Sequence, residues 1–274
     1  MKYDELIIQS GRTELNYWRD LWSYRELFYF LAWRDILVKY KQTAIGIAWA
    51  LLRPLVTMIV FTIVFGKLAK LPSEGAPYAI LVCAAILPWQ FFASAFSEAG
   101  NSLVGNAGML SKIYFPRLII PTSAVITSFI DFLVAGIIMI ALMVWYQHWP
   151  TIRILALPIF IFLAFLAAMG CGIWVATLNV KYRDFGYTIP FLLQLGLYFS
   201  PVGFSSELIP DKWRFIYSLN PLVSVIDGFR WAIVGGDARL YIPGFITSTL
   251  MVILILVTGI LYFRRAERTF ADNI

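Results

Sequence analysis

Long runs of apolar residues dominate the chain, and their lengths match the thickness of a lipid bilayer. A helix rises about 1.5 Å per residue, so a hydrocarbon core of about 30 Å requires roughly 20 apolar residues. The apolar runs predict six such spans, at residues 45–66, 78–97, 118–146, 154–178, 187–204 and 243–263. The pattern therefore predicts an all-α integral membrane protein with six transmembrane helices.

A shorter helical pattern precedes the first predicted span. Its apolar positions recur at helical spacing and are Phe30, Trp33, Leu37 and Tyr40. Its charged positions are Arg34, Asp35, Lys39 and Lys41. Aromatic and basic residues in this arrangement are typical of an amphipathic helix that lies in the headgroup layer of a membrane. A second interpretation, in which the helix also braces a cytoplasmic partner, stays open.

The segment at 205–242 is too long for a simple connection between spans five and six and too apolar for a solvated one. Pro210 and Asp211 predict a short helix that stops at Asn220, and a second apolar stretch predicts another that ends at Gly235 and Gly236. Each helix would be about 15 Å long, too short to cross a bilayer. Either they gate a passage at the outer face, or they form a packed surface cap.

The distribution of charge predicts the orientation of the spans. Lys and Arg number fifteen on the side that carries both termini and seven on the other side, out of 22. The positive-inside rule therefore places both termini in the cytoplasm. It also accounts for the net charge of +6 without nucleic-acid binding, because the basic residues lie mostly at span ends. We expect a cytoplasmic segment at 1–44, a transmembrane domain at 45–263 and a cytoplasmic tail at 264–274.

Composition agrees with a membrane protein and offers little catalytic chemistry. Hydrophobic residues make up 60% of the chain and charged residues 14%. The single histidine, His148, and the two cysteines, Cys83 and Cys171, have no metal-ligand spacing, so we expect no metal site. No GxxxxGK[ST] phosphate loop occurs, so any ATP and Mg²⁺ must bind another chain. A membrane-embedded transferase or polymerase would need clustered carboxylates or metal ligands, which the sequence lacks.

Asp131 is the ionisable residue nearest to the middle of a predicted span. A charge in hydrocarbon is costly, so such residues often relay protons or contact a substrate. Asp131 also lies near Thr127 and Ser128, which favours a protonated or hydrogen-bonded packing residue at least as much. One such residue is few for an ion-coupled carrier, although that class is not excluded.

Short motifs occur in a particular order along nearly the whole chain. They are YKQT at 40–43 with Gly46, Trp49 and LLRPL at 51–55; LPW at 87–89 with Phe91 and Phe92; Lys112 with FPR at 115–117 and Pro121; NVKYRD at 179–184; SPV at 200–202; and LNPL at 219–222 with GFR at 228–230. In this order and spacing the chain resembles the membrane subunits of ATP-binding-cassette exporters that move lipid-linked polysaccharides, as in O-antigen, teichoic acid and capsule export.

The resemblance implies a homodimer that works with two copies of a separate ATPase in the bacterial inner membrane. The implied substrate is an undecaprenyl-linked polysaccharide, with O-antigen expected first and teichoic acid or capsule as alternatives. Motion of the ATPase would be received by the N-terminal helix and by two cytoplasmic loops, with candidate residues Ser111, Lys112, Phe115, Arg117, Tyr182, Arg183 and Asp184. A drug or lipid exporter of the same architecture is a further alternative.

Two more sets of candidates follow from the resemblance. The two short external helices become a gate, with candidate residues Trp213, Asn220, Pro221 and Arg230. Aromatic residues make up 17% of the chain; most are expected in interface belts, but flat rings would also suit a passage for sugars. The candidate conduit lining is Trp89, Phe92, Asp131, Tyr198 and Phe199.

Overall fold

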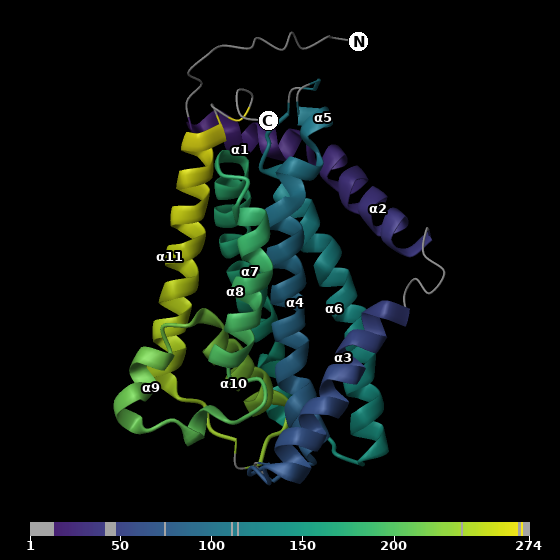
Figure 1. Cartoon of the computed structure of the whole chain (residues 1–274), viewed down its shortest axis with the longest axis vertical. Coiled ribbons are helices and arrows are strands. Elements are labelled where there is room, and N and C mark those ends of the chain that lie inside the picture. Colours follow the sequence, from purple (N-terminus) through teal and green to yellow (C-terminus); the bar gives the residue numbers. More distant parts are fainter. Residues whose placement is uncertain are drawn as a thin grey trace.

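The computed structural model describes residues 14–41, 48–73, 75–110, 112–113, 115–236, 238–267 and 270, and this part of the chain is helical with no strand. Five helical stretches are long and apolar enough to cross a membrane (Figure 1). They are α3 (Ala48–Phe61) continued by the π-helical η1 (Thr62–Leu68), α4 (Tyr78–Gly105), α6 (Ile119–Trp145), η2 (Ile152–Ala156) continued by α7 (Leu157–Lys181), and α11 (Ile242–Ala266). The predicted class, an all-α membrane protein, agrees with this architecture.

The predicted fifth span is shorter than the other five. It corresponds to α8 (Phe185–Phe199), whose 15 residues extend about 22 Å. The sequence pattern placed its end at 204, but the helix stops at Phe199 because Ser200 precedes Pro201 and adopts an extended conformation. The prediction of six spans requires α8 to cross the membrane in addition to the five longer stretches, and it stays a prediction.

Helix α4 forms the centre of the bundle, with α6, α7, α8 and α10 packed around it (Figure 1). Of its 28 residues, all described, 19 are buried. Small residues allow close packing at this centre: a Cβ at Gly172 of α7 would lie 2.8 Å from the Cβ of Ala99. The first span is much less buried than α4. The structure describes all 14 residues of α3, and of these Pro54 and Met58 are buried.

The end of the bundle where α1 begins and α11 ends has its own hydrophobic core, here called the terminal cap. It joins α1 (Glu14–Ser23), the start of α2 (Arg25–Lys41), the short α5 (Ala107–Leu110) and the ends of the long helices. Its buried members are Leu31, Leu103, Leu110, Phe115, Leu118, Ile119, Ile120, Ile173, Ala176, Val180, Phe263 and Phe270.

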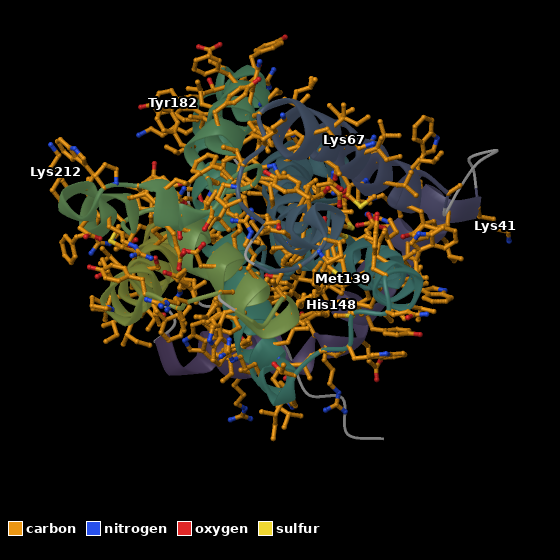
Figure 2. The ribbon with its side chains drawn as sticks, turned by 90° about the horizontal axis from the view of Figure 1, so that it is seen from below. Lys41, Lys67, Met139, His148, Tyr182 and Lys212 are labelled. Atoms are coloured by element: carbon orange, nitrogen blue, oxygen red, sulfur yellow. The ribbon has the colours of Figure 1, made fainter. Side chains whose placement is uncertain are left out.

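Helix α2 slopes away from the cap, so that Lys41 at its end lies at the outer edge of the molecule (Figure 2). Leu31 is buried in the cap, whereas Phe30 and Trp33 are exposed on the outside. Apolar residues therefore occupy two sides of α2, one against the protein and one available to the headgroup layer.

The segment between α8 and α11 lies at the end of the bundle opposite α1 (Figure 1). It contains the 3-10 turn η3 (Ser206–Leu208) and two short helices, α9 (Asp211–Tyr217) and α10 (Pro221–Ile233), where the sequence predicted two. Helix α10 ends where Gly235 and Gly236 take positive φ, as predicted. Ten of its 13 residues are buried, so α10 is part of the bundle core and not a surface cap. A role of these helices as a gate stays a prediction.

Candidate functional site

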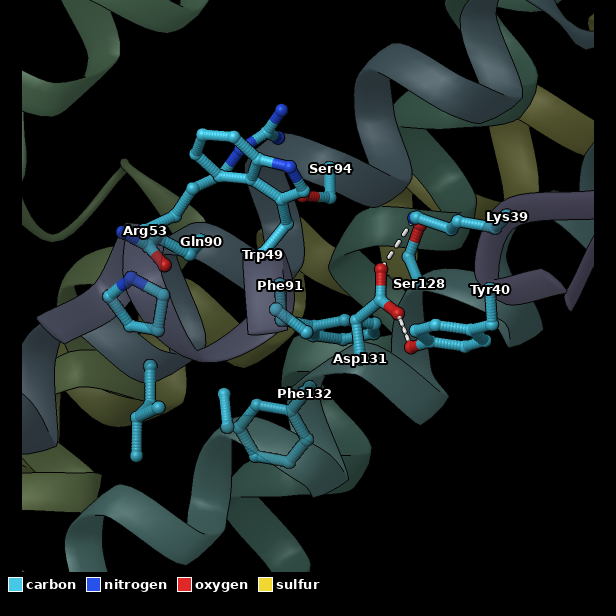
Figure 3. A pocket seen from close by; sticks show the side chains of 14 residues that line it. Lys39, Tyr40, Trp49, Arg53, Gln90, Phe91, Ser94, Ser128, Asp131 and Phe132 are labelled. Carbon is cyan, nitrogen blue, oxygen red and sulfur yellow. Dashed lines mark hydrogen bonds and ion pairs between the residues drawn. The ribbon is translucent and has the colours of Figure 1, made fainter. Parts of the chain in front are cut away.

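Charged and polar side chains from three helices meet where the end of α2 reaches α4 and α6 (Figure 3). The Lys39 ammonium donates to Oε1 of Glu98 at 2.7 Å and to Oδ2 of Asp131 at 2.5 Å. The Tyr40 hydroxyl donates to the other oxygen of Asp131, and Ser128 Oγ donates to Oε2 of Glu98 at 2.8 Å. These five residues, Lys39, Tyr40, Glu98, Ser128 and Asp131, are called the polar cluster below.

The helical period explains how the cluster forms. Ser128 and Asp131 lie three residues apart on α6 and therefore share one face of that helix. Lys39 and Tyr40 come from the last turn of α2. One cation stands between two carboxylates that belong to different helices, so Lys39 links α4 to α6 as well as α2 to both.

Electrostatics keep Lys39 charged and Tyr40 neutral. Burial by itself would lower the pKa of Lys39, but the Glu98 and Asp131 carboxylates attract the ammonium and accept its hydrogen bonds, so that the pKa is raised overall. Burial and the hydrogen bond to Asp131 raise the pKa of Tyr40. Both side chains are therefore donors to the carboxylates at neutral pH.

Two cavities adjoin Lys39. The first is about 270 Å³ and is bounded by Tyr40, Asp131, Gln90 of α4 and Trp49 and Arg53 of α3 (Figure 3). The second, about 330 Å³, is bounded by Asn106, which caps the end of α4, and by residues of α2, α4 and α6, among them Asp35, Val38, Asn101 and Thr127. The end of α2 therefore lies against the bundle with open space beside its ion pairs.

The structure shows Asp131 hydrogen-bonded, although its partners are not the neighbours that the sequence suggested, and a part in transport stays a prediction. Asp131 is neither an isolated intramembrane charge nor bonded to Thr127, because its carboxylate is occupied by Lys39 and Tyr40. The sequence analysis did not associate Lys39, Tyr40 or Glu98 with Asp131. The available signal was a carboxylate in each of two neighbouring spans together with a lysine shortly before the first span.

The predicted coupling residues of the loop before α6 fall into different settings. Ser111 lies outside the described residues. Lys112 is exposed, and Phe115 is buried in the terminal cap. Arg117 is held by the end of α11: its backbone N–H donates to Oε1 of Glu267 at 2.9 Å, and its guanidinium donates to the Glu267 carbonyl at 2.8 Å. The sequence analysis missed Glu267.

Burial raises the pKa of two groups that lie next to each other here, Glu267 and Tyr17. Desolvation raises the pKa of Glu267, although the Arg117 N–H and nearby positive charges oppose the effect. Burial and the neighbouring Glu267 carboxylate also raise the pKa of Tyr17 on α1. The residues of the second predicted coupling loop, Tyr182, Arg183 and Asp184, are exposed between α7 and α8.

The five candidate conduit residues do not form one surface within the protomer. Trp89 and Phe92 are buried, and Trp89 packs against α8 so closely that a Cβ at Gly196 would lie 2.8 Å from its ring. Tyr198 and Phe199 are exposed at the end of α8. Asp131 belongs to the polar cluster. Their role in lining a conduit stays a prediction.

Two candidate gate residues hold the turn that follows α8. Arg230 is 2% exposed, and its guanidinium donates to the carbonyls of Phe204 at 2.6 Å, Val202 at 3.1 Å and Leu81 at 3.4 Å. A buried guanidinium requires such partners.

Asn220 works at the same turn from the start of α10. Its side chain accepts from the Leu222 N–H as a helix cap and donates to Ser200 Oγ at 3.0 Å. Pro221 occupies the first turn of α10. Trp213 is exposed on α9, apart from this junction.

Comparison with known proteins gives a consistent assignment. Residues 26–234 match the family described as ABC-2 type transporter. The chain is 28% identical over 246 residues to an O-antigen export system permease protein, RfbA, of Klebsiella pneumoniae, with 87% of this chain and 91% of that protein covered. It is 26% identical to a protein of the same name from Myxococcus xanthus, with 77% and 82% covered.

A more distant relative has a different named cargo. The polysialic acid transport protein KpsM of Escherichia coli is 22% identical over 248 residues, with 88% of this chain and 93% of that protein covered. The family match spans well over half of the chain, and it agrees with the motifs that run through it. The chain therefore belongs to the ABC-2 type transporter family, as a permease subunit of the ATP-binding-cassette polysaccharide exporter type.

Proposed function

We propose that this chain is the membrane subunit of an ATP-driven exporter that moves an undecaprenyl-linked polysaccharide, with O-antigen as the first candidate, across the bacterial inner membrane. The observation that carries the proposal is the extent of the similarity to an O-antigen export permease, which covers 87% of this chain and 91% of that protein. A transport subunit of this kind leaves ATP and Mg²⁺ to a separate partner ATPase.

The packing of the first and fifth spans supports a homodimeric conduit. Of the fully described helices α3 and α8, α3 buries Pro54 and Met58, and α8 buries Ile189. Large apolar side chains of both helices, including Phe191 and Phe199 of α8, are exposed on the surface of the protomer. A second copy that covers part of these surfaces could enclose a passage that one protomer cannot form.

The exposed cytoplasmic loops support coupling to an ATPase. Lys112 and the three residues Tyr182, Arg183 and Asp184 are exposed, and the loops before α6 and α8 that hold them lie at the end of the bundle where α1 lies (Figure 1). We place both termini in the cytoplasm on the charge distribution, which would direct these loops toward the ATPase. Arg183→Ala should reduce export and transport-coupled ATP hydrolysis several-fold without loss of folded protein, whereas Lys212→Ala at the opposite end should not.

Capsule export is the second candidate function. The likeness to a polysialic acid transport protein along 88% of this chain favours it, although at lower identity than the O-antigen permeases. An ion-coupled carrier has less support, because Asp131 is already neutralised by Lys39 in the polar cluster.

The direct test is purification of the tagged chain from its native membrane, with identification of co-purified proteins and lipid-linked glycans by mass spectrometry. We expect an ATPase in equal amount, and loss of one surface polysaccharide when the gene is deleted. The identity of that polysaccharide separates O-antigen from capsule. A homo-oligomer without an ATPase, from cells whose deletion leaves every surface polysaccharide unchanged, would contradict the proposal.

A further inference from the structure

The N-terminal helices are attached to the bundle in two chemically different ways. The start of α2 buries Leu31 in the terminal cap, where its side chain is 2% exposed among apolar neighbours. The end of α2 is instead attached through the polar cluster, beside cavities of about 270 and 330 Å³. The first attachment is dense and apolar, and the second is polar with space around it.

We propose that Lys39 is a positioning residue for transport, which holds the end of α2 against α4 and α6 through its ion pairs and lets α2 and the adjoining span α3 shift when these pairs open. The part that concerns transport rests on the proposed export function. The attachment of α2 by Lys39 does not, and it can be tested on the isolated chain.

Lys39 is the residue on which the cluster depends. Glu98 and Asp131 are carboxylates from different helices, and Lys39 bonds to both at 2.7 and 2.5 Å. Without the ammonium, two partly buried negative charges would face each other with no cation between them, which favours their separation and hydration. Loss of Lys39 should therefore detach α2 and loosen the contact between α4 and α6 at this point.

The same contacts are able to open. The side chains of Lys39 and Glu98 are each 36% exposed, so water can replace either partner at small cost. The two cavities leave room for the displaced side chains. Water cannot replace the packing contacts of an apolar side chain such as Leu31 in the same way, so opening those contacts is costly. The polar attachment is thus suited to a contact that forms and breaks during a cycle.

Movement of the end of α2 would reach the first span directly. Trp49, Arg53 and Pro54 of α3 line the same cavity as Lys39 and Asp131 (Figure 3). Helix α3 lies against α4 and α6 but is shallowly packed, since Pro54 and Met58 are its buried residues among the fully described 48–61. A weakly packed span beside a breakable ion pair can take two positions, and a small energy difference selects between them.

The attachment is tested by cross-linking across the second cavity in a chain whose two native cysteines are replaced by alanine. Val38→Cys on α2 and Asn101→Cys on α4 place one thiol from each helix in the lining of that cavity. We expect a short bifunctional maleimide to join them efficiently, and Lys39→Gln to reduce the yield by about fivefold or more. Lys41→Gln, an exposed change two residues along the same helix, is the matched control and should leave the yield unchanged.

Two further variants protect the test against simple misfolding. Lys39→Arg retains the cation and should restore both the cross-link and export. Asp131→Asn added to Lys39→Gln should reduce the cross-link little further, because the interaction it removes is already lost. Additive losses from the two substitutions would show that Lys39 and Asp131 act separately, and would overturn the proposal.

Export by the whole transporter, with its ATPase present, supplies the second readout. We expect Lys39→Gln to lower export at least as strongly as it lowers the cross-link, at normal amounts of assembled complex. An unchanged cross-link in Lys39→Gln would overturn the attachment, and unchanged export despite a lost cross-link would overturn the positioning role. If wild-type cells export no polysaccharide while the cross-link still depends on Lys39, the proposed function fails and the attachment stands.

Discussion

The terminal cap and the polar cluster both hold the N-terminal helices, but they differ in how their energy depends on water. The cap removes apolar side chains such as Leu31 and Phe263 from solvent, and any opening exposes all of that surface at once. The cluster joins Lys39 to Glu98 and Asp131 at a site that water reaches. The comparison teaches that one end of α2 is built to stay in place and the other to exchange partners.

The largest expected effect comes from the cap. Leu31→Ala should lower the free energy of unfolding by about 2–4 kcal/mol, because it removes a fully packed side chain and leaves a cavity. Leu37→Ala on the exposed side of the same helix is the matched control, with an expected change within about 0.5 kcal/mol. Thermal unfolding in detergent measures both, and equal shifts would mean that the cap is not the firm attachment.

The next effect concerns the hydrogen bond between the end of α11 and the loop before α6. Glu267→Ala leaves the Arg117 N–H without its acceptor and should cost about 1–3 kcal/mol. Glu267→Gln keeps an acceptor oxygen in place and should cost less. Unfolding measured on both variants separates the lost hydrogen bond from the lost charge, and equal losses would contradict a role of the hydrogen bond.

The raised pKa of Glu267 also predicts a pH dependence. The folded state binds the proton more tightly than the unfolded state, so this contribution is present below the unfolded pKa of about 4.3 and is lost as pH rises through the raised folded value. Wild type should therefore lose stability relative to Glu267→Gln over that rise. The difference between the two proteins, measured at a series of pH values, isolates this group, and a constant difference would be the contrary result.

The smallest effects on stability are expected within the polar cluster, where the two carboxylates, Asp131 and Glu98, should contribute unequally. The Asp131 side chain is 17% exposed and that of Glu98 36%, so the Lys39 pair with Asp131 is less screened by water. Asp131→Asn should cost about 1 kcal/mol of stability, and Glu98→Gln less. Double-mutant cycles with Lys39→Gln measure each coupling, and a larger value for Glu98 would reverse the ranking.

The periodicity of the sequence was sufficient for much of the fold because span length and apolarity are local properties. Five of the six predicted spans have their counterpart in helices long enough to cross a membrane, and the two short helices before α11 lie where Pro210, Asn220 and Gly235 predicted their ends. The end of α8 was misplaced, because apolar residues continue beyond Ser200 and conceal the break at Pro201.

The motifs identified the family, but they did not reveal which residues meet. Arg230 was predicted as a gate residue, and only the fold shows that its guanidinium secures the turn at Val202 and Phe204 to α4. Likewise Arg117 was predicted as an ATPase-coupling residue, which stays a prediction, and only the fold shows that it is also bonded to Glu267, 150 residues away along the chain.

The sequence by itself determined that the chain is helical, membrane-embedded and a member of a transporter family, because hydrophobic length and motif order are properties of the linear chain. Only the tertiary structure decided that Asp131 is paired with Lys39, that α10 lies inside the bundle, and that α2 has one apolar and one polar attachment. Such pairings depend on how helices distant in sequence are placed, and a charge in an apolar run gives no indication of the helix that will neutralise it.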